Sequence, residues 1–197
     1  MSRPVDPTRK PELLEEIVDY LGEHGVATMT MRNLADGIGV STTVLTYHFG
    51  GKKKLLQESV AAAEKGMLES MREGIAAGGV PEGICRFWDW ISAGESRIRK
   101  LGVVLETMAL DNGSWAPVFS GRPSVNSVWI EMIARSLVAD GVPPDEVEPY
   151  TTMIHGALLG LCLDIWDSGD EVRVRQAIDL LVSYTEQVIE QAPARSV

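Results

Sequence analysis

A short segment in the first quarter of the chain carries side chains suited to contact with a nucleic acid. Ser41 can cap a helix over residues 42–48, and rotation by about 100° per residue divides its side chains between two sides. One side carries four hydroxyl-bearing residues: Thr42, Thr43, Thr46 and Tyr47. The opposite side carries four residues that can pack: Val44, Leu45, His48 and Phe49. Hydroxyls suit phosphate oxygens and base edges, and threonine methyls suit thymine methyls.

An ordinary surface helix is the alternative interpretation of this segment. Its outward face would usually carry Glu, Lys or Gln, whereas this one carries three threonines and a tyrosine. A preceding helix is predicted from Thr30, a plausible N-cap, with Met31, Leu34, Ala35 and Ile38 on one side. Gly39 ends it, so two short helices meet at a glycine-containing turn. This is the pattern of a helix-turn-helix, whose second helix can enter the DNA major groove.

The charge distribution is compatible with that interpretation, although the whole chain is acidic. Its 18 basic and 28 acidic residues give a net charge of -10, and affinity for phosphate is built from Lys and Arg. The deficit lies entirely after residue 56, and the segment 37–57 holds three lysines and no acid. The run Lys52–Lys54 is by itself more typical of a solvated face.

The remaining sequence predicts further helices and no strand. A helix is expected after Pro11, where apolar residues recur at helical spacing as far as Leu21. Later helices are expected at about 52–74, 82–92, 95–110, 124–138, 145–166 and 171–191, with loops at 111–114 and 120–123. The fold class is therefore all-α. We expect a three-helix helix-turn-helix domain over residues 1–51, joined to a larger helical domain over 52–197.

Several classes of protein are not expected from this sequence. The longest apolar stretch, 156–163, is too short to span a bilayer, and the polar N-terminus does not resemble a secretory signal. Cys85 and Cys162 are far apart, as is typical of reduced thiols in a cytoplasmic protein. No GxGxxG, P-loop, HExxH or GxSxG motif is present. We therefore expect no catalytic residues, cofactor, metal site or membrane association.

Four pieces of the N-terminal segment together resemble the signature of the TetR family of transcriptional regulators. They are residues 30–35 (TMRNLA), 39–41 (GVS), 45–49 (LTYHF), and Lys52 followed by Leu55 and Leu56. The resemblance covers about a quarter of the chain and implies operator DNA as a partner. One position departs from the family pattern, since Thr46 stands where a tyrosine usually reaches a phosphate. Tyr47, the next residue, is a candidate to replace that contact.

The resemblance implies roles for nine residues. Thr30 would cap its helix beside a phosphate, and Arg32 would reach a phosphate or a guanine edge. Base or groove-shape contacts are implied for Thr42, Thr43, Val44 and Tyr47. Phosphate contacts are implied for Thr46 (with its shorter side chain), His48 and Lys52. A solvated arginine and a packing histidine are the alternatives for Arg32 and His48.

The family resemblance makes the C-terminal domain a site for a small, largely apolar effector and a homodimer interface formed by the last two helices. The candidate ligand-binding residues are Trp88, Met108, Trp129, Met132 and His155. Core packing is the alternative for each of them. We expect a ligand-responsive regulator, a repressor released from a palindromic operator by its effector. The alternative is a helical small-molecule carrier or partner-binding protein that has lost DNA binding.

Overall fold

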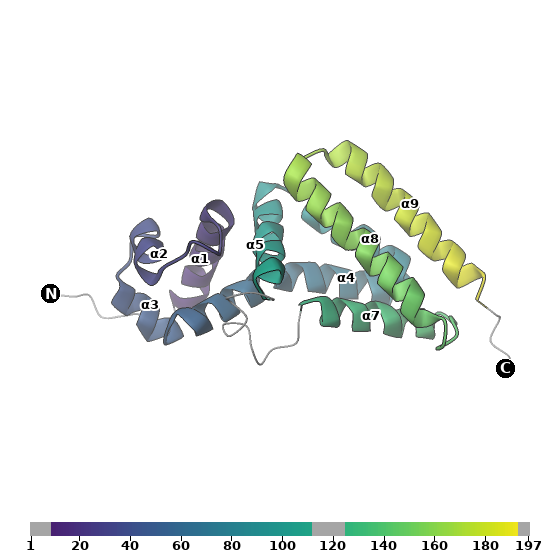
Figure 1. The fold of residues 1–197 in the computed structure, drawn as a ribbon, viewed down its shortest axis with the longest axis horizontal. Helices are drawn as coiled ribbons and strands as arrows, with labels where there is room; N and C mark the ends of the chain where they lie inside the picture. Colours follow the sequence, from purple (N-terminus) through teal and green to yellow (C-terminus); the bar gives the residue numbers. More distant parts are fainter. Residues whose placement is uncertain (1–8, 112–124, 193–197) are drawn as a thin grey trace. The chain divides into compact units, whose positions relative to one another are not determined.

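The computed structural model describes residues 9–111 and 125–192, and every regular element in these two ranges is a helix (Figure 1). The helices are α1 (Lys10–His24), α2 (Met31–Gly37), α3 (Thr42–Phe49), α4 (Lys52–Ile91), α5 (Glu95–Asp111), α7 (Val125–Ala139), α8 (Val147–Ser168) and α9 (Glu171–Glu190). The expected all-α class is confirmed. Nearly all of the expected loop at 111–114, and the whole of that at 120–123, lie outside the described residues.

The chain forms two compact units. The first contains Met1–Lys65 and Arg99–Arg122, and the second contains Gly66–Ile98 and Pro123–Val197. The first unit therefore includes the beginning of α4 and most of α5 together with the three N-terminal helices. This grouping does not coincide with the division expected between residues 51 and 52, which remains a proposal about function.

The first unit is built on the buried side of α1. Pro11 stands in the first turn, where its missing N–H is not needed, and Leu13, Ile17, Val18 and Leu21 are each at most 1% exposed. Leu34 of α2 and Leu45 of α3 are fully buried as well. The helical spacing seen in the sequence thus marks the core of this unit correctly.

The second unit contains a break in α4, at the position expected from the sequence. Gly78 and Gly79 leave helical geometry, and Gly79 has a φ of 74°, which strongly favours glycine. Pro81 follows in the first turn of the resumed helix, where a proline is tolerated. The two segments of α4 then approach closely, because a Cβ on Gly74 would lie 2.5 Å from the Cα of Gly83.

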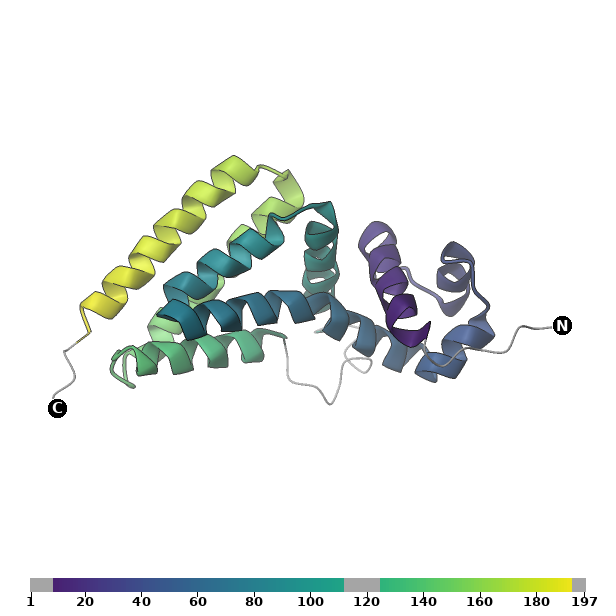
Figure 2. The same ribbon diagram turned by 180° about the vertical axis from the view of Figure 1, so that it is seen from behind.

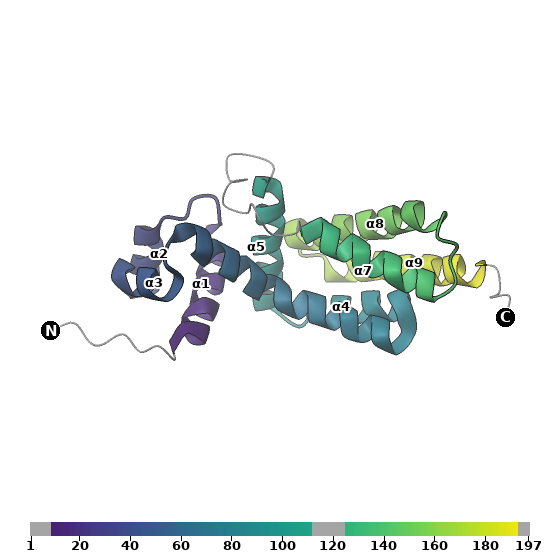
Figure 3. The same ribbon diagram turned by 90° about the horizontal axis from the view of Figure 1, so that it is seen from below.

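The helices α8 and α9 lie side by side, joined by a short turn (Figures 1 and 2). Figure 3 shows α7 beside α8. The buried side chains of these two helices include Ile154, Leu158, Ile165, Val174 and Ile178. At the turn, Arg173 donates two hydrogen bonds to the carboxylate of Asp164, at 2.5 and 2.6 Å. These bonds lower the pKa of Asp164 and raise that of Arg173.

Candidate nucleic-acid interface

The third helix presents its hydroxyl-bearing side to solvent. Thr42, Thr43, Thr46 and Tyr47 are exposed, and Tyr47 retains 60% of its surface. On the opposite side Leu45 and Phe49 are fully buried, while Val44 and His48 are half-buried. The division predicted by helical rotation is therefore confirmed by the burial of each side chain. The buried pair holds the helix in place and leaves its polar side available to a partner.

Local capping fixes where α3 begins and ends. The hydroxyl of Ser41 accepts a hydrogen bond from the backbone N–H of Val44 at 3.3 Å. Gly50 ends the helix in the left-handed conformation, and its N–H bonds to the carbonyl of Thr46 at 2.8 Å. Gly39, with a φ of 70°, provides the turn from α2. These features make residues 31–49 a helix-turn-helix.

The beginning of α2 is a reciprocal capping box. The Thr30 hydroxyl accepts from the backbone N–H of Asn33 at 3.1 Å, and Asn33 Oδ1 accepts from the backbone N–H of Thr30 at 2.7 Å. Asn33 Nδ2 also donates to the carbonyl of Thr28 at 3.2 Å. The expected capping role of Thr30 is confirmed. Asn33 is a partner in this cap that the sequence reasoning did not single out, although a polar residue three positions after Thr30 is its usual signal.

Lys52 connects the start of α4 to the turn before α2. Its ammonium group donates a hydrogen bond to the carbonyl oxygen of Met29, and partial burial lowers its pKa. This contact lies next to the Thr30 cap. Lys52 therefore helps to position α2, a role that the sequence did not indicate. Its predicted phosphate contact stays a prediction.

The other two cationic candidates have different surroundings. The Arg32 side chain is 90% exposed and lies 4.0 Å from Asp36, so only a weak surface ion pair restrains it. The His48 ring packs edge-to-face against the Tyr47 ring, with ring centroids 5.1 Å apart. Its Nε2 is buried and has no hydrogen-bond partner among the described residues. This nitrogen fits the packing alternative for His48 better than a phosphate contact.

Two charged residues of α5 make long-range contacts within the first unit that were not found from the sequence. Glu106 Oε2 accepts a hydrogen bond from the backbone N–H of Val26 at 2.7 Å, in the turn between α1 and α2. Lys100 Nζ pairs with Glu15 Oε2 of α1, also at 2.7 Å. Each contact joins residues 80 or more positions apart. No local pattern in the sequence could have revealed them.

The five candidate ligand residues lie in different surroundings. Trp88 and Trp129 are buried, and the Phe87 ring packs edge-on against Trp129 with centroids 5.2 Å apart. His155 is half-buried on α8, and its burial lowers its pKa. Met108 belongs to the first unit. Met132 alone of the five lines a groove of about 490 Å³ in the second unit.

Two other features, a metal-ligand cluster and a membrane-spanning helix, are absent from the described part of the chain. Within residues 9–111 and 125–192, three or more His, Cys, Asp or Glu side chains do not gather where they could hold a metal ion. In the same ranges, no helix combines the length and apolar character needed to cross a membrane.

The fold and the site together define a helix-turn-helix protein. Residues 13–59 match the family model described as bacterial regulatory proteins, tetR family. This N-terminal segment is therefore similar to the TetR family of bacterial regulatory proteins. Since members of this family are regulators and not enzymes, the family agrees with the expectation of no catalytic site.

A curated relative supports the same family through part of its length. The chain is 29% identical over 73 residues to the HTH-type transcriptional regulator BetI of Agrobacterium fabrum. That match covers 37% of this chain and 34% of the relative. The likeness therefore extends over about a third of each protein.

Solved structures resemble the chain over most of its length. A transcriptional regulator from Rhodococcus sp. Rha1 aligns with a TM-score of 0.73 at 20% identity, covering 90% of this chain and 96% of that one. The multidrug binding protein EbrR, complexed with imidazole, aligns with a TM-score of 0.65 at 19% identity. That alignment covers 100% of this chain and 96% of the EbrR chain. BioQ with its double-stranded DNA operator aligns with a TM-score of 0.51 at 22% identity, covering 88% of this chain and 98% of the BioQ chain. At these identities the likeness establishes the fold.

Proposed function

We propose that this chain is a ligand-responsive repressor that binds a palindromic operator through the exposed side of α3. The observation that carries the proposal is the exposure of Thr42, Thr43, Thr46 and Tyr47 above a buried Leu45 and Phe49. A helix whose opposite side is buried in the protein can enter a major groove and present hydroxyls and methyl groups to base edges. BioQ, a structural neighbour, has been crystallised with operator DNA.

Tyr47 is the central residue of this proposal. Thr46 has a shorter side chain than the tyrosine that usually reaches a phosphate at its position, and Tyr47 extends from the same exposed side. We assign Tyr47 to a phosphate or base contact, with Thr42 and Thr43 beside it. Arg32 is exposed near the start of α2 and is assigned to the DNA backbone. The contacts assigned to Val44, His48 and Lys52 rest on the family pattern alone.

The proposed repressor is a homodimer formed through α8 and α9. Their outer side exposes large apolar residues: Met153 45%, Leu163 51%, Trp166 42%, Val172 73% and Leu180 73%. Gly156, Ala157 and Gly160 lie on the exposed side of α8, where small residues allow a second helix to approach closely. An exposed apolar surface of this kind is typical of a protein interface. A two-fold axis through it would supply the two recognition helices that a palindrome requires.

The effector is proposed to act by shifting the dimer between two arrangements that differ in affinity for the operator. EbrR, another structural neighbour, was crystallised with a small molecule, imidazole. In this chain the second unit carries a groove large enough for a small ligand.

The first test is binding of the purified protein to a labelled DNA fragment from immediately upstream of its coding region, together with selection from random-sequence DNA. We expect specific, salt-sensitive binding and an enriched palindromic sequence. Tyr47→Ala should weaken binding to the selected site by about 1–3 kcal/mol, or roughly 5-fold to 150-fold. Tyr47→Phe separates the contribution of the hydroxyl from that of the ring.

Ser96→Ala is the matched control, because it removes an exposed hydroxyl in the first turn of α5. It should leave DNA affinity unchanged. If neither the upstream fragment nor any selected sequence binds at low salt, the repressor is excluded and the carrier or partner-binding alternative stands.

A further inference from the structure

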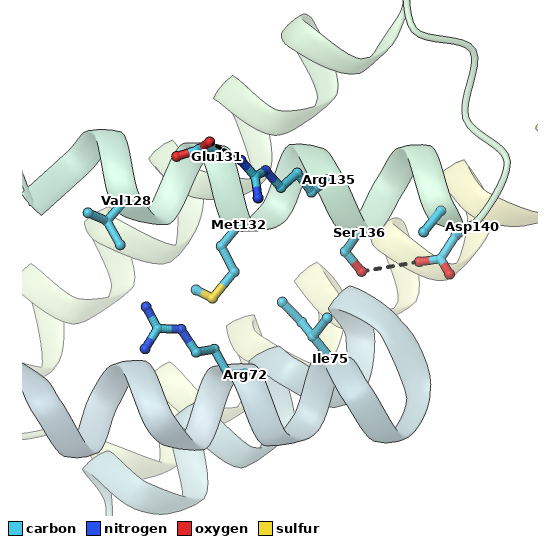
Figure 4. Close-up of a pocket in the computed structure, with 9 residues that line it drawn as sticks. Arg72, Ile75, Val128, Glu131, Met132, Arg135, Ser136 and Asp140 are labelled. Carbon is cyan, nitrogen blue, oxygen red and sulfur yellow. Dashed lines mark hydrogen bonds and ion pairs between the residues drawn. The ribbon is translucent and has the colours of Figure 1, made fainter.

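A groove in the second unit lies between α7 and the part of α4 that precedes its break. It has a volume of about 490 Å³, within the range of roughly 300–1,000 Å³ that small-molecule sites occupy. Its lining comes from two helices only: Arg72 and Ile75 of α4, and Val128, Glu131, Met132, Arg135, Ser136 and Ala139 of α7, with Asp140 just beyond. Figure 4 shows these side chains around the space between the helices.

The middle of the groove is apolar. Ile75 reaches from α4 toward α7, and Met132 reaches from α7 toward α4 (Figure 4). Both side chains are half-buried, as is Val128 near one end. Methionine is flexible and polarisable, so it adapts to the shape of an apolar ligand.

Most charged groups around this apolar centre already have partners. Arg135 forms an ion pair with Glu131 one turn earlier on α7. Asp140 accepts a hydrogen bond from the hydroxyl of Ser136 at 3.5 Å and lies beside Gly79 at the break in α4. The Glu131 carboxylate is therefore balanced by Arg135, and the remaining carboxylate, that of Asp140, lies toward the opposite end of the groove from Val128 (Figure 4).

Arg72 differs from them. It makes no ion pair or hydrogen bond with any described residue, and its guanidinium lies at the α4 side of the groove near Met132 (Figure 4). A guanidinium offers five N–H donors in a fork that matches a carboxylate. The groove thus combines an unpaired cation with an adjoining apolar surface.

We infer that this groove binds a small organic anion with an apolar body, such as a medium-chain or aromatic carboxylate. The carboxylate pairs with Arg72, and the apolar body lies against Met132, Ile75 and Val128. A neutral ligand would leave the guanidinium without a counter-charge, and an organic cation would meet it with repulsion. As the chemical class of the effector, this inference rests on the proposed function. As a binding site, it can be tested alone.

The test uses the full chain with methionine methyl groups labelled with ¹³C, titrated with octanoate and followed by NMR. Met132→Leu identifies the Met132 signal. Met31, half-buried on α2 in the first unit, is the internal control for adsorption of the probe elsewhere on the protein. Octylammonium and 1-octanol are the matched probes with the same apolar body and a different head group.

We expect a saturable shift of the Met132 signal with octanoate, little change at Met31, and weaker binding of both matched probes. Arg72→Gln should weaken octanoate binding by roughly tenfold. Arg86→Gln is the control, since Arg86 is an exposed arginine of the same helix already paired with Glu82. Equal binding of octylammonium, or unchanged octanoate binding by Arg72→Gln, would overturn the inference.

Operator binding by the same unlabelled protein, measured without octanoate, separates this inference from the proposed function. If octanoate shifts the Met132 signal but the protein binds no operator, the anion site in the groove is supported and the repressor function is excluded. If the protein binds its operator but the Met132 signal does not respond to octanoate, the anion site is excluded and the repressor function is unaffected.

Discussion

The third helix of the first unit and the α8–α9 pair of the second unit differ in what they leave exposed. The solvent side of α3 carries hydroxyls, and its large aliphatic and phenyl groups are buried behind it. The outer side of α8 and α9 carries methionine, leucine, tryptophan and valine at 42–73% exposure. A polar partner with many acceptors, such as DNA, suits the first surface, whereas another apolar protein surface suits the second. The kind of side chain left in solvent thus indicates the class of partner.

The two regions also differ in what supports them. α3 is eight residues long and depends on Leu45, Phe49 and its end caps. α8 and α9 are 22 and 20 residues long, lie side by side, and each bury apolar residues along their length. Substitution of a buried residue should therefore have its largest effect on the stability of α3. Substitution of an exposed apolar residue should have its largest effect on the dimer contact proposed for α8 and α9.

The largest effect is expected from Phe49→Ala. The Phe49 ring is fully buried, and the ammonium group of Lys10 lies 5.1 Å from its centroid. Removing the ring should lower the free energy of unfolding by about 3–5 kcal/mol because it leaves a cavity. Urea denaturation measures the loss, and size-exclusion chromatography should still show a dimer. Tyr47→Ala is the control on the same helix and should leave unfolding nearly unchanged, since Tyr47 is exposed.

If Phe49→Ala abolished dimerisation as completely as DNA binding, the two regions would not be independently supported. The contrast drawn between them would then be wrong.

The next effect is expected from Leu180→Glu. Leu180 is 73% exposed on the outer side of α9, so a glutamate there costs the monomer little. In a two-fold dimer both copies would place a carboxylate in the apolar interface. We expect the dimer to weaken by about 2–4 kcal/mol, or roughly 30-fold to 1,000-fold. Sedimentation equilibrium measures the dissociation constant. Val138→Glu on α7 introduces the same charge at a 44% exposed position and is the control.

A Leu180→Glu protein that remained as dimeric as the parent chain would show that α9 is not the interface. Equal weakening by Val138→Glu would place the apolar contact on α7 as well.

The local features of this fold could be predicted because they depend on neighbouring residues. Helical spacing identified the buried side of α1, and rotation assigned each side chain of α3 to the correct surface. The break at Gly78 and Gly79 followed from the glycine pair and the proline after it. These features are set by backbone preferences within a few residues.

The tertiary contacts could not be predicted in the same way. The hydrogen bond from Lys52 to the Met29 carbonyl and the groove beside Arg72 both depend on how separate helices pack. The family resemblance suggested ligand contacts at Trp88, Met108, Trp129, Met132 and His155. Of these, Met132 lines the groove described above, and Trp88 and Trp129 are buried. An aromatic residue on a helix looks the same in sequence whether it lines a site or fills a core.

The smallest effect is expected at Glu106, whose carboxylate joins α5 to the turn between α1 and α2. Val26 is fully buried, so Glu106→Ala would leave its backbone N–H without the acceptor that lies 2.7 Å away. The expected cost in the free energy of unfolding is about 1–3 kcal/mol, with weaker operator binding. Glu106→Gln keeps an acceptor oxygen and should recover part of both losses, because a neutral acceptor bonds less strongly than a carboxylate. Glu23→Ala removes an exposed carboxylate from α1 and should change neither measurement. If Glu106→Ala were as stable as the parent chain, the contact of Glu106 with the turn between α1 and α2 would not stabilise the first unit.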